Sequence, residues 1–259
     1  MVRGSLRWYI AFAVPAFAGC GRIAFDVAGR EGPCANPDPI AATVKLTGTT
    51  FQYTDFLNNT SPFPNVSVGA FDVDGGMNAI ATTLSDASSN YELMIPTNGA
   101  PRPAVIKYSQ AGFWSTWVDS DQPYDRDLVA ANMTHWRLGD GPIWSDGSMG
   151  SVYSTLNATI DASLGTLSIS ARTCSGELVT GVHFDIDPMP SIFGYLDSSG
   201  LPKPMAAGTM PPYAQLVAFG VTPGPTVIRA SKAGLQFNEL SVMVLPGDNI
   251  SFTVVHPNE

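Results

Sequence analysis

A ten-residue phrase occurs twice in this chain. Residues 103–112 read Pro-Ala-Val-Ile-Lys-Tyr-Ser-Gln-Ala-Gly, and residues 225–234, which lie 122 positions later, read Pro-Thr-Val-Ile-Arg-Ala-Ser-Lys-Ala-Gly. Tyr91 and Tyr213 are separated by the same 122 positions. A repeat at the spacing of a whole domain indicates that the chain contains two copies of one module.

The composition fits two turn-rich modules. A length of 259 residues allows one or two domains at about 150 residues each. Hydrophobic residues make up 44% of the chain, which is enough to build cores, while 25 glycines and 21 prolines favour turns and β structure over helices. The net charge of −9 argues against a nucleic-acid partner, because an acidic surface repels phosphate groups.

Short stretches with apolar residues at every second position predict β-strands in both copies. The alternating sets are Val66, Val68 and Ala70; Leu167, Ile169 and Ala171; Val182, Phe184 and Ile186; Val242 and Val244; and Ile250, Phe252 and Val254. Strands at roughly ten-residue spacing, separated by Gly, Pro, Asn and Asp, are typical of an antiparallel sandwich. We expect an all-β protein with two antiparallel sandwiches, at residues 42–121 and 165–259.

The segment between the two modules, residues 122–164, has a different pattern. Residues 127–138 could form a helix that is capped by Asp127 and stopped by Gly139. Val152, Leu156 and Ile160 stand four apart, which predicts a helix over residues 151–160. We expect this linker to carry one or two short helices that pack on a sandwich.

The first 19 residues have the layout of a signal peptide. Arg3 and Arg7 are followed by a nearly apolar stretch at residues 8–17, which is too short to span a membrane. Residues 17–20, Phe-Ala-Gly-Cys, resemble the lipoprotein box of bacteria, in which the cysteine receives a lipid, although Phe17 departs from the usual aliphatic residue. The alternative is ordinary secretion, because residues 16–18 are themselves an Ala-x-Ala cleavage site.

The lipoprotein resemblance implies a cellular location. Lipidation at Cys20 would make the membrane a partner of the chain, with residues 20–41 as a tether. An Asp after the cysteine is the usual signal for retention in the inner membrane, and Gly21 stands there instead. The resemblance therefore implies the outer membrane or the cell surface.

Two further cysteines remain if Cys20 is acylated. Export leads to an oxidising compartment, where Cys34 and Cys174 could form a disulfide that clips the tether to the second module. The alternative is two unpaired thiols. A zinc site is not indicated, because no two cysteines have ligand spacing.

Both modules resemble a known family, the carboxypeptidase regulatory-like domain, which is a transthyretin-like β-sandwich. The resemblance rests on residues 174–182, 209–213 and 221–234 of the second copy and on residues 64–68, 82–91 and 104–113 of the first. Asn90 replaces a common glycine, and the opening turn of the first copy, at residues 47–63, is longer and more polar than usual. The resemblance implies an accessory domain without catalytic residues.

The residues themselves carry no catalytic signature, so we expect no enzyme and no cofactor. The motif of zinc peptidases, His-Glu-x-x-His, does not occur, and residues 146–150, Asp-Gly-Ser-Met-Gly, lack the first glycine of a serine hydrolase elbow. The histidines are His135, His183 and His256.

An acidic run and two tryptophans are the remaining site candidates. Carboxylates could bind Ca²⁺, but the run lacks the spaced acids and closing Glu of a Ca²⁺ loop, and a solvated loop with a helix cap explains it better; its members are Asp119, Asp121, Asp125 and Asp127. Trp114 and Trp117 could stack on sugars if they are exposed, or they could pack against the linker.

The sequence therefore predicts a non-catalytic lipoprotein of the envelope or cell surface. It would act as a binding, display or structural module, with an envelope protein or a glycan as its partner. The alternative is a carbohydrate-binding module that uses Trp114 and Trp117.

Overall fold

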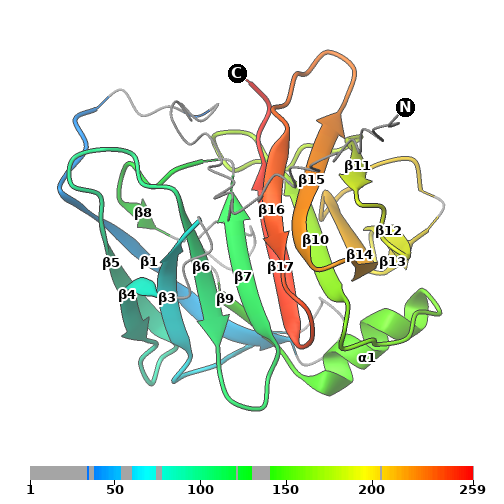
Figure 1. The fold of residues 1–259 in the computed structure, drawn as a ribbon, viewed down its shortest axis with the longest axis horizontal. Helices are drawn as coiled ribbons and strands as arrows, with labels where there is room; N and C mark the ends of the chain where they lie inside the picture. The colour runs from blue at the N-terminus through cyan, green and yellow to red at the C-terminus, as the bar shows by residue number, and fades with distance from the viewer. Residues whose placement is uncertain are drawn as a thin grey trace, which may run out of the picture.

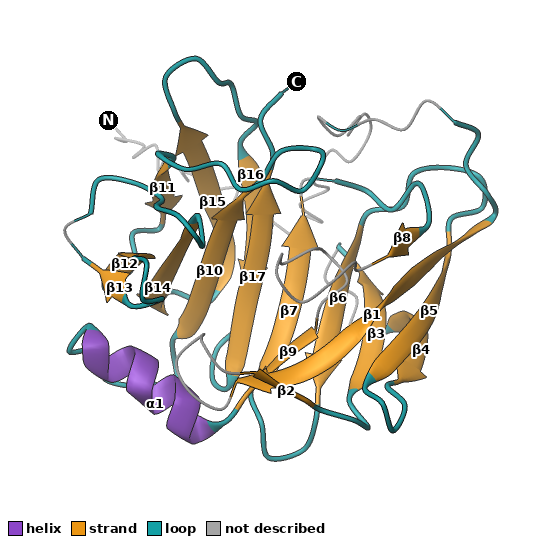
Figure 2. Cartoon of the chain, turned by 180° about the vertical axis from the view of Figure 1, so that it is seen from behind, coloured by secondary structure: helices purple, strands orange, loops and turns teal. Residues whose placement is uncertain are grey.

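The computed structural model describes residue 34 and residues 38–53, 60–73, 78–120, 122–129, 141–204 and 206–258. Almost all of the regular structure in these residues is β-strand, so the expected all-β class is confirmed (Figure 1). The one helix of the described part covers an end of the second half (Figure 2). No helix among these residues is both long and apolar enough to cross a membrane.

The strands of the first half alternate with short turns. They are β1 (Thr43–Tyr53), β2 (Thr60–Pro62), β3 (Ser67–Asp72), β4 (Ala79–Leu84), β5 (Asn90–Pro96), β6 (Ala104–Ser109), β7 (Ser115–Ser120), β8 (Leu128–Val129) and β9 (Gly141–Trp144). The second half begins with α1 (Asp146–Thr155) and continues with β10 (Gly165–Ala171), β11 (His183–Asp187), β12 (Ile192–Leu196), β13 (Pro202–Lys203), β14 (Gln215–Val221), β15 (Gly224–Ser231), β16 (Leu240–Val244) and β17 (Asn249–Val255).

A nine-stranded sheet runs through both halves of the molecule. Its order is β13-β12-β14-β10-β17-β7-β6-β3-β4, and its middle strands lie side by side in Figures 1 and 2. The halves meet where β17 pairs in parallel with β7, and Ile250 is opposite Thr116 while Phe252 is opposite Val118. The two halves are therefore joined by main-chain hydrogen bonds as well as by the linker.

Two smaller sheets cover this long sheet on opposite faces. Residues directly opposite each other on neighbouring strands point to the same face, and successive residues point to opposite faces. Val118 and Phe252 belong to the core under the sheet of β1 and β5. Ile169 and Val255, which point the other way, belong to the core under the sheet of β11, β15 and β16. Each half is thus a sandwich, and the shared sheet supplies one layer of both.

The repeated phrase occupies the same place in each sandwich. It forms β6, between β3 and β7, and β15, between β11 and β16. Ile106 and Ile228 are fully buried. The turn that follows has Gly112 at φ 82° and Gly234 at φ 80°, the conformation that the third residue of a type II turn requires. The repeat therefore preserves a core strand and the turn after it.

The linker helix lies earlier than its pattern predicted. The hydroxyl of Ser145 accepts a hydrogen bond from Ser148 N at 3.2 Å and caps α1, which starts at Asp146 rather than at residue 151. The helix ends at Thr155, and Asn157 has a positive φ of 52°. Ile160, expected on the buried stripe, lies beyond the helix and is 43% exposed. The cap at Ser145 therefore sets where the helix begins, and the spacing of Val152, Leu156 and Ile160 predicted a start that is too late.

Two other expectations for the first half were wrong. The helix expected from Asp127 does not begin there, because Leu128–Val129 forms β8 beside β1; residues 130–138 lie outside the described part. The long polar turn expected over residues 47–63 begins as strand, since β1 extends to Tyr53; residues 54–59 lie outside the described part. Threonine is a good strand former, and Thr47, Thr49 and Thr50 continue the strand although they lower its hydropathy.

Candidate functional site

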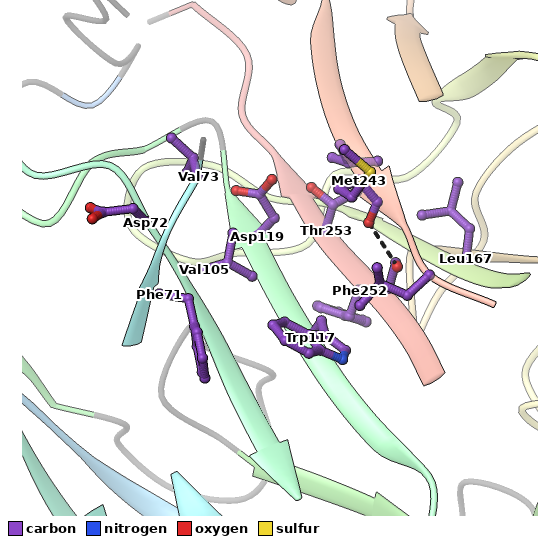
Figure 3. A pocket seen from close by; sticks show the side chains of 13 residues that line it. Phe71, Asp72, Val73, Val105, Trp117, Asp119, Leu167, Met243, Phe252 and Thr253 are labelled. Carbon is purple, nitrogen blue, oxygen red and sulfur yellow. Dashed lines mark hydrogen bonds between the residues drawn. The ribbon is translucent and has the colours of Figure 1, made fainter. Parts of the chain in front are cut away.

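An apolar pocket lies where the two halves of the described chain meet, and we call it the junction pocket. It has a volume of about 220 Å³. Phe71, Val105 and Trp117 line it from β3, β6 and β7 of the first half, and Val242 and Met243 line it from β16 of the second (Figure 3). The pocket lies on the face of the long sheet that β16 covers only in part. Its walls thus depend on both halves of the molecule.

Trp117 is the largest side chain in this pocket, and it is half-buried. Its Nε1 donates a hydrogen bond to Asn249 Oδ1 at 2.9 Å, and its ring centroid is 5.3 Å from that of Phe71. Lys107 Nζ lies 4.7 Å from the centre of the Trp117 ring, within the range of a cation–π contact. These three contacts fix the ring in place as part of the pocket wall.

Trp114 does not join Trp117 in an exposed pair. It is only 2% exposed, and its Nε1 donates to Asp146 Oδ1 at 2.9 Å. Residues three apart on an extended chain point to opposite faces, so one tryptophan faces the pocket and the other packs near Tyr153 on α1. Of the two alternatives for Trp114, exposure for sugar stacking and packing against the linker, the structure shows the second.

The acidic run is dispersed rather than gathered. Asp119 lines the junction pocket, Asp125 accepts from Arg126 Nε at 2.8 Å, and Asp127 Oδ1 accepts from Lys45 N at 2.7 Å. Asp121 lies outside the described residues. Within the described part, no cluster of three or more His, Cys, Asp or Glu side chains could hold a metal ion.

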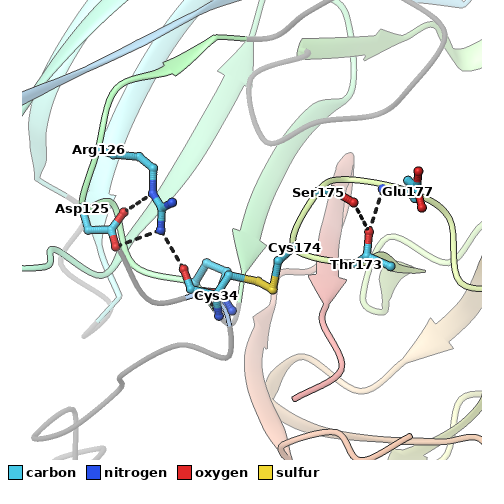
Figure 4. The surroundings of a disulfide bond; sticks show 8 residues. Cys34, Asp125, Arg126, Thr173, Cys174, Ser175 and Glu177 are labelled. Atoms are coloured by element: carbon cyan, nitrogen blue, oxygen red, sulfur yellow. Dashed lines mark hydrogen bonds and ion pairs between the residues drawn. A yellow bond between two sulfur atoms is a disulfide. The ribbon is translucent and has the colours of Figure 1, made fainter. Parts of the chain in front are cut away.

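A disulfide ties the N-terminal segment at Cys34 to the second half. Cys34 and Cys174 are bonded, with their Cα atoms 5.3 Å apart, as the sequence led us to expect (Figure 4). Cys34 N donates to Gln122 Oε1 at 3.1 Å, and Arg126 Nη2 donates to Cys34 O at 2.7 Å. Cys34 thus contacts the loop after β7 as well as its partner cysteine, and it adds a second connection between the two halves.

The remaining candidates for chemistry lie apart from this pocket. His183 is exposed, and its Nδ1 lies 3.3 Å from the hydroxyl of Tyr195. Burial raises the pKa of the Tyr195 hydroxyl, and the hydrogen bond that this hydroxyl accepts from Phe184 N offsets part of the rise. His256 is buried, and His135 lies outside the described part. Ser148, from the near-match to a serine hydrolase elbow, lies on α1 and donates its hydroxyl to Tyr53 O of β1 at 2.8 Å.

Phe71, Val105 and Met243 were not singled out from the sequence. Met243 carried one available signal, since it is a large apolar residue at the outward position between Val242 and Val244, where it is 43% exposed. Phe71 and Val105 gave none, because each stands within an ordinary strand pattern. Their role in the pocket follows from the way the halves join.

Comparisons with known proteins do not place the chain in a family. No family model matches it, and no curated protein matches it. Solved structures that it resembles include the TIE protein of Bacillus anthracis (11% identity, TM-score 0.26, covering 83% of this chain and 34% of that one). Others are the shaft pilin SpaA of Lactobacillus rhamnosus GG (11%, 0.25, 84% and 98%) and a minor pilin of Streptococcus agalactiae (11%, 0.26, 83% and 95%). TM-scores this low carry no inference about what this chain does.

Proposed function

We propose that this protein is a non-catalytic binding module of the cell envelope and that it binds an apolar group in the junction pocket. The observation that carries this proposal is the pocket itself, a concave and mainly apolar site with one tryptophan held in its wall. Sites of this kind are the usual place where a protein holds a ligand. The ionisable side chains among its described lining residues are Asp72 and Asp119, and no histidine, cysteine or lysine stands beside them in that lining.

The construction of the molecule supports a binding role. The pairing of β7 with β17 and the Cys34–Cys174 bond both hold the two halves in one arrangement. A pocket whose walls come from both halves keeps its shape only if the halves do not move apart. Binding to a preformed site avoids the entropy cost of ordering it.

Attachment to the envelope is a further part of the proposal. Residues 1–33, which include Cys20, lie outside the described part of the chain, so the anchor rests on the sequence alone. We propose lipidation of Cys20 and a place at the outer membrane or cell surface, and we propose descent of both halves from a regulatory-like domain. Radioactive palmitate should label the wild-type chain in cells and should not label Cys20→Ala; label that persists in the variant would exclude the anchor.

The neutral probe N-phenylnaphthylamine tests the pocket. We expect its fluorescence to rise on binding one site per chain, and Trp117→Ala to weaken that binding roughly tenfold, since a ring face buried against the probe is worth about 1.4 kcal/mol. Met243→Ala should also weaken it and is less disruptive, because Met243 is partly exposed. Met189→Ala is the matched control, since Met189 is 77% exposed and does not line the pocket. Equal affinity in all four proteins would refute the site.

A further inference from the structure

The repeat makes β7 and β16 equivalent strands. In the first half, β6 is followed by the glycine turn and then by β7, which pairs with it antiparallel and sets Val118 opposite Ile106. In the second half, β15 is followed by the same turn and then by β16, which sets Leu240 opposite Ile228. Val118 and Leu240 are 122 positions apart, like the repeated phrase. Each sandwich therefore has the same strand at the same edge.

The two equivalent edges differ in what they pair with. The outer edge of β7 receives β17 in parallel, over six residue pairs from Asn249 opposite Ser115 to Val254 opposite Ser120. The outer edge of β16 is an end of its three-stranded sheet, and among the described residues β16 pairs with β15 alone. The outer edge of β7 is thus paired with another strand, and the equivalent edge of β16 is paired with no strand of the described residues.

Main-chain groups of β16 point out of that open edge. Pro225 is opposite Met243, and proline is favoured at strand positions where no ladder N–H is needed, which fits a pair in which the groups of Met243 point away from β15. Ser251 Oγ, on β17, donates a hydrogen bond to Met243 O at 3.1 Å, so this carbonyl points away from β15 and already accepts one bond, which leaves its second lone pair for an added strand. Every second residue of a strand points its main-chain groups to the same edge, so the N–H and C=O of Ser241 also point away from β15.

The space beside this edge is the junction pocket. In the long sheet, β7 follows β17, so a strand added next to β16 would lie over β7 and over its half-buried Trp117. Met243 and Trp117 already line the two sides of that space (Figure 3). An added strand would therefore gain main-chain hydrogen bonds from β16 and an apolar surface for every second side chain.

We infer that the edge of β16 receives an extended segment of a partner protein, which pairs with it as β17 pairs with β7 and inserts an apolar side chain into the junction pocket. The inference rests on the proposed function, since it names the partner of the same pocket. The chemistry of the segment follows from β17, where apolar Ile250, Phe252 and Val254 alternate with polar residues. The partner is thus a β-strand with apolar residues at alternate positions.

A peptide copied from β17 serves as the probe. The probe is the acetylated and amidated peptide Asn-Ile-Ser-Phe-Thr-Val-Val with a fluorescent label. One analogue would be N-methylated at the first, third, fifth and seventh residues, and the other at the second, fourth and sixth residues. Only one edge of the peptide can face β16, so one analogue should bind at least tenfold more weakly and the other should bind like the parent. Amide hydrogen exchange should slow at Ser241 and Met243 when the parent peptide binds.

Variants of the protein complete the test. Met243→Pro removes an outward N–H without removing a bond to β15, so it should abolish peptide binding while circular dichroism remains that of the wild type. Met189→Ala should bind the peptide normally.

Other outcomes would overturn the inference in distinguishable ways. Equal binding of both analogues, or no peptide binding while N-phenylnaphthylamine still binds, would refute strand pairing and leave the proposed function standing. Failure of both peptide and N-phenylnaphthylamine to bind would refute both. A dimer in sedimentation that Met243→Pro dissociates would mean that a second copy of the chain, rather than another protein, occupies the edge.

Discussion

The indole of Trp117 is hydrogen-bonded to the side chain of Asn249, a residue 132 positions away in the sequence. The bond crosses from β7 to β17, the two neighbouring strands at which the sheets of the two sandwiches join into one long sheet. Asn249 Nδ2 also donates to Pro246 O at 2.7 Å, in the turn between β16 and β17. One side chain thus connects the pocket wall, the junction and the turn that brings β17 back to it.

Asn249→Ala should lower the free energy of unfolding and weaken ligand binding together. Two hydrogen bonds are lost and the indole N–H keeps no partner from Asn249, which should cost about 1–3 kcal/mol. Chemical denaturation measures the first effect and N-phenylnaphthylamine titration the second. Asn258→Ala, which removes an exposed bond to Asn238, should change neither. Unchanged probe binding in Asn249→Ala would show that this bond does not position Trp117.

Replacing both bonded cysteines should destabilise the chain strongly. The Cys34–Cys174 bond closes a loop with a sequence separation of 140, and the chain-entropy relation gives about 4–5 kcal/mol for a loop of that size. Urea denaturation of Cys34→Ser/Cys174→Ser, compared with wild type with and without a reducing agent, measures the loss. The reduced wild type should match the variant, and a difference below about 1 kcal/mol would mean that the bond does little for stability.

The glycines of the two repeat turns should respond alike to substitution. Gly112→Ala and Gly234→Ala force a side chain into a positive φ, and nothing lies within 4 Å of either added Cβ, so only backbone strain of about 1–2 kcal/mol should appear. Gly150→Ala is the control, because it also meets nothing within 4 Å but lies in α1. That substitution should stabilise by about 0.5–1 kcal/mol. Thermal denaturation of the three variants separates the two effects.

Asp197 should make stability depend on pH in the acid range. Burial by itself raises the pKa of this carboxyl, but hydrogen bonds from Leu201 N and Ser199 N and the nearby Lys203 lower it, and the net shift is downward. A lowered folded-state pKa contributes stability above the unfolded value, near 3.8, that is lost as the pH falls through the folded-state value.

Asp197→Asn is the matching experiment. It removes the charge and keeps an acceptor, so it should cost about 1 kcal/mol at pH 7 and progressively less toward pH 2. The measurement is the free energy of unfolding at several pH values. Asp185→Asn, whose carboxylate is exposed and pairs with Arg229 at 3.7 Å, should cost under about 0.5 kcal/mol throughout. A constant difference between wild type and Asp197→Asn would contradict the pKa shift.

The local patterns of the sequence were reliable where burial follows an alternation. Val68 and Ala70, or Val242 and Val244, are buried on one side of their strands as the period of two requires. The repeat also located equivalent turns, because a positive φ at Gly112 and Gly234 needs glycine. These features are decided within a few residues, and a sequence displays them directly.

The pocket could not be found in this way. It exists because β17 pairs with β7, and nothing in either strand encodes which distant edge it will meet. The same is true of Trp114 and Trp117, which are near neighbours in sequence and were treated as a pair. The strand period separates them, and only the structure shows that the extended chain begins at the bridge of Trp114 with Trp144 and continues as β7.

The position of β17 also determines when the protein can fold. Phe252 and Val254 complete the core of the first half, while Val255 completes that of the second. A chain that emerges from a ribosome or a translocation channel with its N-terminus first must therefore wait for residues 249–255 before either core is closed. Non-local pairing of this kind slows folding. A chain that must cross a membrane unfolded would gain from such a delay, because it would stay open until residues 249–255 are delivered.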